Sequence, residues 1–306
     1  MLRSVILAAS RSSRIARLAS TAPVCRHVVS RFVAGTTTAD AVRATRELVA
    51  SGLAVTLDYL GEDTLTAEQA AATRDAYLHL LSALVAAQLA PAAEVSLKLS
   101  ALGQRFDEKL AHGYAAEVCA AAAAAGTTVT LDMEDHSTTD STLDILARLR
   151  QDLPTVGVAL QAYLRRTEAD CRDLAGPGSR VRLCKGAYAE PESVAYQAKL
   201  EVDRSYVRCL SLLMSGEGYP MLATHDPRLV AIGEDRARWF DRAPGEFEFQ
   251  MLYGVRPVEQ LRLVAEGYTV RVYVPYGTRW YGYLMRRLAE RPANLALLAR
   301  AVRSRK

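Results

Sequence analysis

Two adjacent arginines near the end of the chain, Arg286 and Arg287, have the spacing that most directly suggests a ligand. In a helix, at about 100° per residue, Tyr283, both arginines and Glu290 fall within a roughly 100° arc. Paired guanidinium groups suit a carboxylate or phosphate held through two hydrogen bonds, and Glu290 is spaced to orient both arginines. The alternative is a solvated helix face with ordinary ion pairs. The rest of the sequence distinguishes a ligand-binding face from a solvated one.

Further reactive side chains gather toward the carboxyl ends of short apolar segments. They are Asp58, Lys98, Asp132, Glu134, Gln161, Lys185, Tyr188, His225, Gln250 and Tyr273. Singly, each has an ordinary explanation, such as a lysine at the edge of the core, a helix-capping carboxylate or a turn. Polar residues scattered at random would lie at both ends of the segments. The concentration of these reactive side chains at one end of the segments, together with Arg182, predicts one pocket and favours an enzyme.

The apolar segments that carry these residues are typical of β-strands. They span 53–60, 94–102, 127–135, 156–164, 180–188, 219–227, 247–255 and 268–277. The intervening stretches behave as helices: 66–89 contains no Gly or Pro, and 115–125 is almost pure helix former before Gly126. Alternating strands and helices indicate a parallel sheet, and eight such units predict an α/β fold of the (β/α)8 TIM-barrel class.

Length and charge set further limits. The chain has 306 residues, which a single barrel domain accommodates, and its net charge is +4. The basic residues are dispersed, so a dedicated nucleic-acid surface is not expected. Five cysteines form no CxxC pair and fit free thiols in a reducing compartment such as the cytoplasm. The five histidines form no HxH or HExxH pair, so no metal site is expected.

The first 39 residues contain arginines but no acid. Such a segment is typical of a mitochondrial transit peptide, or of a basic helix that covers the domain or touches anionic lipid. No apolar run reaches the length of a membrane span, so any membrane contact would be peripheral. We therefore expect an N-terminal helical arm over 1–45 and a catalytic barrel domain over 46–306.

The chemistry of the pocket has several readings. A Walker A motif and a serine nucleophile elbow are absent. Lysines at strand ends, such as Lys98 or Lys185, leave a Schiff-base lyase or aldolase open. Many anion-binding groups and few proton shuttles fit a redox cofactor better, because a flavin carries the hydride chemistry itself. A non-catalytic binder of anionic metabolites, or a scaffold, is the third reading.

Seven sequence blocks, in order, resemble those of the proline dehydrogenase family in its monofunctional bacterial form. They are VSLKLSALG, TLDMED, LQAYLRR, RVRLCKGAY, ATHDP, EFQMLYGV and RVYVPYGTRWYGYLMRRLAERPANL. The resemblance covers about residues 50 to 300, includes every expected strand, and is most specific in its last block. It implies a distorted barrel whose final helix lies over the mouth.

The resemblance also implies roles for individual residues. Lys98, Arg286 and Arg287 would bind the substrate carboxylate, and Glu290 would support the arginines by ion pairing. Tyr273, Tyr283 and Leu252 would surround the proline ring. Asp132 would brace the carboxylate-binding cluster or a neighbouring tyrosine. The residues expected to bind FAD are Gln161, Arg182, Lys185, Tyr188, Thr224 and His225.

The implied reaction is oxidation of L-proline to Δ1-pyrroline-5-carboxylate, the first step of proline catabolism, by hydride transfer from proline C5 to flavin N5. The family further implies that electrons pass to a quinone, possibly at a membrane surface. Because no second dehydrogenase domain is expected in this chain, a separate pyrroline-5-carboxylate dehydrogenase would consume the product.

Overall fold

The computed structural model describes residues 29–62 and 64–290, without the side chains of 288–290. Its eight parallel strands form a closed barrel, in which β1 pairs with both β2 and β8. The strands are β1 Ala54–Tyr59, β2 Ala93–Leu97, β3 Val129–Leu131, β4 Gly157–Gln161, β5 Arg180–Cys184, β6 Tyr219–Ala223, β7 Glu248–Leu252 and β8 Val270–Tyr276. All eight predicted strands and the predicted (β/α)8 class are confirmed.

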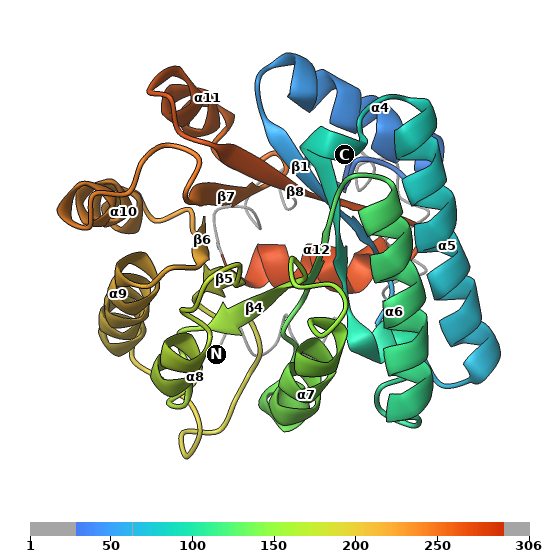
Figure 1. Cartoon of the computed structure of the whole chain (residues 1–306), viewed down its shortest axis with the longest axis horizontal. Coiled ribbons are helices and arrows are strands. Elements are labelled where there is room, and N and C mark those ends of the chain that lie inside the picture. The colour runs from blue at the N-terminus through green and yellow to red at the C-terminus, as the bar shows by residue number, and fades with distance from the viewer. Residues whose placement is uncertain (1–28, 63, 291–306) are drawn as a thin grey trace, which may run out of the picture.

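Helices between successive strands surround this barrel, with one further helix before the first strand and another after the last (Figure 1). They are α4 Thr38–Ala50, α5 Ala67–Ala86, α6 Glu108–Ala124, α7 Thr139–Leu149, α8 Thr167–Asp173, α9 Lys199–Ser215, α10 Pro227–Trp239, α11 Pro257–Ala265 and α12 Trp280–Glu290. Three short 3₁₀ helices are η1 Ala90–Ala92, η2 Leu99–Leu102 and η3 His136–Thr138. The helices predicted over 66–89 and 115–125 correspond to α5 and to the second half of α6.

Local sequence explains where these helices start and stop. The Thr66 hydroxyl accepts a hydrogen bond from Gln69 N at the start of α5, and the Asp107 side chain accepts one from Leu110 N at the start of α6. Both caps satisfy a backbone N–H that a first helical turn leaves without a partner. Gly126, directly after the C-cap of α6, has a φ of +73°, a conformation that favours glycine.

Most of the strands are shorter than predicted at their carboxyl ends. β2 ends at Leu97 and β3 at Leu131, so Lys98 and Asp132 begin the loops that follow. After β2 the backbone turns at once into η2, with the Ala101 N–H donating to Lys98 O. Apolar composition continues past this turn, because Leu99 and Leu102 are themselves fully buried, and the sequence therefore resembled a longer strand.

The apolar core lies between the strands and the helices outside them. Val55, Leu57, Val95 and Leu97 are fully buried in it. The inward positions of the same strands are largely polar, and they include Thr56, Glu94 and Ser96. Because successive side chains of a strand point to opposite faces, the alternation places a polar layer inside the barrel.

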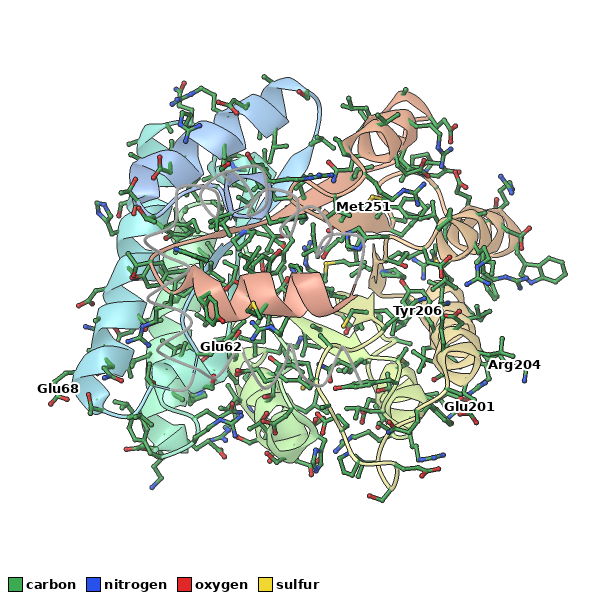
Figure 2. All side chains as sticks on the ribbon, turned by 180° about the vertical axis from the view of Figure 1, so that it is seen from behind. Glu62, Glu68, Glu201, Arg204, Tyr206 and Met251 are labelled. Atoms are coloured by element: carbon green, nitrogen blue, oxygen red, sulfur yellow. The ribbon has the colours of Figure 1, made fainter. Side chains whose placement is uncertain are left out.

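Helix α12 lies across the barrel opening on the side where the strands end, as Figure 2 shows from behind. It is held there by a small apolar cluster in which Tyr283 and Leu284 pack with Phe32, Val33 and Leu60. The prediction that the final helix covers the barrel mouth is confirmed. Arg286 and Arg287 lie in the second half of α12, and Arg286 pairs there with Glu62.

The predicted N-terminal arm is mostly outside the described residues, since 1–28 are not among them. The proposed targeting or lipid-binding segment falls in the same region. Residues 29–35 are described, and Ala34 N donates to Pro275 O at the end of β8. The boundary predicted at residue 45 falls within α4, which packs on β1 and β8. The division into arm and barrel domain stays a prediction.

Candidate active site

A buried lysine and two carboxylates lie where β1, β2 and β3 end. Lys98 Nζ lies 2.8 Å from Asp58 Oδ1 and 3.0 Å from Asp132 Oδ2. The Tyr273 hydroxyl, from β8, donates to Asp132 Oδ2 at 2.6 Å and lies 3.2 Å from Lys98 Nζ. Side chains from four neighbouring strands thus meet at one point, because the parallel register brings all carboxyl ends to the same rim and the long Tyr273 side chain reaches it from the middle of β8.

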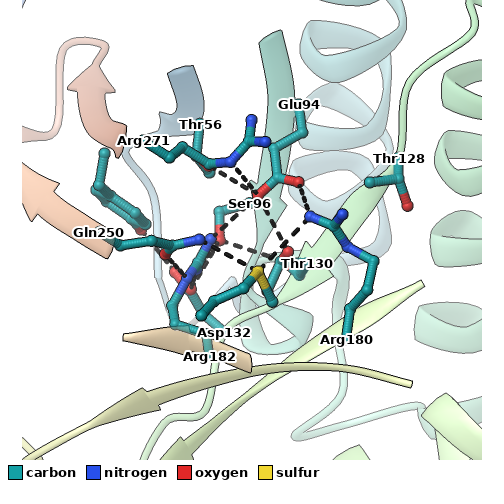
Figure 3. A network of polar contacts seen from close by, with 12 residues as sticks. Thr56, Glu94, Ser96, Thr128, Thr130, Asp132, Arg180, Arg182, Gln250 and Arg271 are labelled. Atoms are coloured by element: carbon teal, nitrogen blue, oxygen red, sulfur yellow. Dashed lines mark hydrogen bonds and ion pairs between the residues drawn. The ribbon is translucent and has the colours of Figure 1, made fainter. Parts of the chain in front are cut away.

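Arg182, on β5, joins this cluster from the opposite side of the barrel (Figure 3). Its Nη1 donates to Asp132 Oδ1 and to Ser96 Oγ, both at 2.7 Å. Its Nε donates to Gln250 Oε1 at 2.6 Å. Ser96 Oγ also donates to Asp132 Oδ1 at 2.7 Å. Arg182 is buried, and donors on two edges of its guanidinium group are held, so its orientation is fixed.

A second layer of ion pairs lies deeper in the barrel, and Figure 3 shows how it meets the first. Glu94 is fully buried and accepts hydrogen bonds from Arg180 at 2.6 Å and from the Thr56 hydroxyl at 2.7 Å. Arg271 forms two hydrogen bonds to Glu248, at 2.7 and 3.1 Å. These charged side chains lie lower in the strands, so the polar residues extend beyond the carboxyl ends toward which the sequence predicted them to gather.

The clustered charges set the ionisation of the site. Burial favours the neutral form of Asp132, but Lys98 and Arg182 outweigh it and lower its pKa to about 2. Burial also opposes the charged form of Lys98, yet Asp58 and Asp132 hold its pKa well above the ordinary value. Burial dominates for Asp58, whose pKa is raised. Lys98 is therefore an ammonium ion at neutral pH, and Asp132 is a carboxylate.

The two arginines of α12 have different surroundings. Arg286 forms a two-point ion pair with Glu62, in the loop after β1, with Nη1 to Oε2 at 2.9 Å and a second contact from Nη2 to Oε1. The guanidinium carbon of Arg287 lies 5.3 Å from the centre of the Tyr283 ring. The predicted partner Glu290 has no described side chain, so its pairing with either arginine stays a prediction. The carboxylate that Arg286 contacts in the structure is Glu62.

The residues expected to bind a flavin lie around β4, β5, β6 and the loops that follow them. Gln161 Nε2 donates to Met133 O at 3.1 Å, whereas the buried Gln161 Oε1 accepts no hydrogen bond from the described residues. Lys185 Nζ pairs with Asp203 at 2.5 Å and with Asp226 at 3.0 Å. Tyr188 is half-buried, and burial raises its pKa.

Thr224 and His225 follow β6, next to β7. Leu252 N donates to His225 Nε2 at 2.9 Å, so this ring nitrogen is an acceptor and the proton of the neutral imidazole is on Nδ1. Thr224 Oγ1 accepts a hydrogen bond from Asp226 N at 3.2 Å. Leu252 is half-buried at the end of β7. The residues predicted to bind the substrate thus lie on or after β2, β7 and β8 and on α12, whereas those predicted to bind the cofactor lie on or after β4, β5 and β6. Their roles stay predictions.

Several residues of the cluster were not assigned to the site by sequence. The sequence indicated Asp58 and Gln250 only as polar residues at strand ends, although that position is where the other site residues were predicted. Ser96 has the signal of an inward strand position between Glu94 and Lys98. Glu62 has no such signal, because it lies in an irregular loop and its partner is 224 positions away.

Comparison with known proteins gives consistent matches over nearly the whole chain. A family model described as proline dehydrogenase matches residues 41–300. Proline dehydrogenase 1 of Bacillus subtilis (strain 168) is 37% identical over 302 residues, 99% of this chain and 99% of that protein. Proline dehydrogenase of Deinococcus radiodurans is 39% identical over 285 residues, 90% of each chain. Among solved structures, proline utilization A of Bdellovibrio bacteriovorus, inactivated by N-propargylglycine, superposes with a TM-score of 0.80 and 26% identity, covering 86% of this chain and 32% of that one.

Proposed function

This chain belongs to the proline dehydrogenase family, and on that premise we propose that its barrel mouth oxidises L-proline to Δ1-pyrroline-5-carboxylate with FAD as the hydride acceptor. The observation that supports the proposal most strongly is the convergence of Lys98, Asp132, Arg182 and Tyr273 under the arginines of α12. This cluster offers fixed charges that can bind the charged groups of an amino acid, and it contains no obvious nucleophile. Oxidation of proline in proline catabolism follows from membership of the family.

The residues on the β4–β7 side fit a flavin. Gln161 Oε1 is a buried acceptor without a donor among the described residues, and an isoalloxazine ring carries an N–H group that would satisfy it. Lys185 would offset phosphate charge, and Arg182, Tyr188, Thr224 and His225 would complete the binding set. When bound, the flavin supplies the two-electron acceptor for the hydride of proline C5.

Arg286, Arg287 and Lys98 would hold the substrate carboxylate. The contact between Arg286 and Glu62 supports this role, because it shows a carboxylate bound at two points by this guanidinium group. A substrate carboxylate that takes the same position must displace Glu62. Tyr273, Tyr283 and Leu252 would enclose the ring, and Asp132 holds Tyr273 in place through its hydroxyl.

Proline enters as an ammonium ion and must lose a proton from nitrogen before hydride can leave C5. Positive charges fixed nearby lower the pKa of that ammonium group, so water accepts the proton without a dedicated base. The same charges orient the carboxylate, which fixes the ring relative to the acceptor. The protein thus contributes binding, orientation and electrostatics, and the roles of all these residues are part of the proposal.

The proposal extends to the fate of the electrons and the product. A membrane quinone would accept the electrons, which suits a protein that works in the cytoplasm at a membrane surface. A separate pyrroline-5-carboxylate dehydrogenase would consume the product. Among the residues that the structure describes, no helix is long and apolar enough to cross a bilayer.

The competing Schiff-base reaction needs a neutral lysine amine. Lys98 is held as an ammonium ion between Asp58 and Asp132, and Lys185 is paired with two carboxylates. Neither is poised to attack a carbonyl carbon. The structure therefore disfavours a lyase.

A single preparation tests the proposal. The purified protein should be yellow, and incubation with L-proline should yield a product that reacts with o-aminobenzaldehyde. Borohydride added with a carbonyl substrate should leave the mass of the peptides containing Lys98 and Lys185 unchanged. A colourless, active protein with a borohydride-trapped lysine would establish the lyase instead.

A further inference from the structure

Glu134, after β3, is a buried carboxylate that the reaction described above does not use. It is 4% exposed, and both oxygens accept hydrogen bonds from one residue, Ser100, from the backbone N–H at 3.0 Å and from the hydroxyl at 2.6 Å. No lysine or arginine among residues 29–62 and 64–290 forms an ion pair with it. Buried carboxylates in proteins usually have a cationic partner, so this one calls for an explanation.

Ser100 connects Glu134 to two segments of the proposed substrate site, the turn after Lys98 and the loop after β1. It belongs to η2, directly after Lys98. Its carbonyl oxygen accepts hydrogen bonds from Thr64 N at 3.2 Å and from the Thr64 hydroxyl at 3.0 Å. Thr64 is in the same loop as Glu62, the partner of Arg286. Ser100 thus joins Glu134 both to the turn that carries Lys98 and to the loop that carries Glu62.

The ionisable groups that interact with Glu134 come from three loops, those that follow β1, β2 and β5. Glu62 and Lys98 are near enough to shift its ionisation in opposite directions. Tyr188, from the loop after β5, is influenced by Glu134 and also by Arg286 of α12. Burial raises the pKa of Glu134 to about 7, against the hydrogen bonds of Ser100. Its charge therefore changes near neutral pH, beside the turn that carries Lys98 and one residue from the loop that carries Glu62.

We infer that Glu134 is a positioning residue whose charge controls how tightly the pocket holds the substrate carboxylate. Neutral Glu134 leaves the positive field of Lys98 and Arg286 intact. Ionised Glu134 adds a negative charge that opposes an incoming carboxylate. The inference rests on the proposed function, because it takes these cations as the carboxylate site. It predicts an affinity for anionic substrate analogues that falls as the pH rises through neutrality.

The test uses cyclopentanecarboxylate, a five-membered ring acid without an amine, which stays ionised between pH 6 and 8.5. Its dissociation constant is measured on the flavin-loaded protein from the change in the flavin spectrum. We expect binding to weaken about tenfold over this range, which corresponds to about 1.4 kcal/mol. In Glu134→Gln the dissociation constant should stay low and independent of pH, since the amide carries no charge, while its oxygen accepts from the Ser100 N–H and its NH2 group donates to the Ser100 hydroxyl oxygen.

Two further variants separate a charge effect from a structural one. Ser100→Ala removes a hydrogen bond that stabilises the ionised carboxylate, so the midpoint of the pH dependence should move upward. Glu62→Gln removes a neighbouring negative charge, so the midpoint should move downward. If Glu134→Gln does not fold, these opposite shifts decide the matter. Glu68→Gln, an exposed acid in α5, is the matched control and should behave as the unaltered protein does.

An undiminished pH dependence in Glu134→Gln, or midpoints that stay fixed in Ser100→Ala and Glu62→Gln, would overturn the inference. A protein that is bleached by L-proline but binds the analogue equally at all pH values would overturn it while leaving the proposed function intact. A protein that neither binds the analogue nor reacts with L-proline would overturn both.

Discussion

Replacing Asp132 with asparagine should be the most damaging conservative change in the barrel. The Asp132 carboxylate contacts Lys98, Arg182, Ser96 and Tyr273, and no other carboxylate of the described cluster contacts both the lysine and the arginine. Asparagine has nearly the same shape but one acceptor oxygen and no charge. Asp132→Asn therefore leaves two buried cations facing an amide.

The size of the effect can be worked out from the ionisation of Asp132. Its pKa falls from the ordinary 3.8 to about 2 in the folded protein, and each pKa unit corresponds to about 1.4 kcal/mol. Since the folded pKa is the lower one, this stabilisation of about 2 kcal/mol is present above pH 4 and is lost as the pH falls through 2. Breaking a buried ion pair by removing one partner costs about 3–5 kcal/mol. We expect the free energy of unfolding at pH 7 to fall by about 2–4 kcal/mol.

Urea unfolding and steady-state proline oxidation measure the two consequences. The value of kcat/KM should fall at least a hundredfold, about 2.7 kcal/mol, because Lys98, Arg182 and Tyr273 lose their common anchor. Asp144→Asn, on the exposed face of α7, is the control and should change neither quantity. If Asp132→Asn unfolds at the same urea concentration as the control and oxidises proline normally, then the cluster does not organise the site.

Four other substitutions have defined outcomes. Glu134→Gln should raise the free energy of unfolding at pH 8 by up to about 3 kcal/mol but should not change it at pH 4. The folded pKa of Glu134, about 7, lies above the ordinary 4.5, so the cost of ionising the buried carboxyl grows between these pH values. Equal effects in urea unfolding at both pH values would contradict this. Glu62→Gln should lower the KM for proline several-fold, because it frees Arg286 from a competing carboxylate; an unchanged KM would show that the ion pair does not compete. Arg286→Met should reduce kcat/KM at least tenfold, about 1.4 kcal/mol, with unchanged flavin content, and normal kinetics would make this helix face a solvated one. Lys185→Met should weaken FAD retention by about 1–3 kcal/mol in equilibrium dialysis, and unchanged retention would remove Lys185 from the flavin site.

The barrel was predictable because its strands carry a strong local signal. Each is a short apolar run bounded by turn residues, and α5 and α6 begin at recognisable caps. The carboxyl ends were less predictable, because Leu99 and Leu102 continue the apolar run after the backbone has turned into η2. The apolar signal reports burial, and burial does not distinguish a strand from the tight turn that follows it.

The inner layer of ion pairs could have been found in the sequence. Glu94-x-Ser96, Arg180-x-Arg182, Glu248-x-Gln250 and Arg271-x-Tyr273 repeat a polar residue at every second position of a strand, which predicts a polar interior. The pairing of Arg286 with Glu62 could not have been found this way. It joins a helix to an irregular loop, and only the closure of the barrel brings them together.

The most direct test of proline oxidation by this barrel is an anaerobic titration of the flavin-loaded protein with L-proline. The absorption band of the flavin is recorded at each addition. We expect one equivalent of L-proline to bleach one equivalent of flavin, and the product to react with o-aminobenzaldehyde. A flavin that stays oxidised in excess L-proline, in a protein that still binds it, would contradict the assignment of this barrel as a proline-oxidising site.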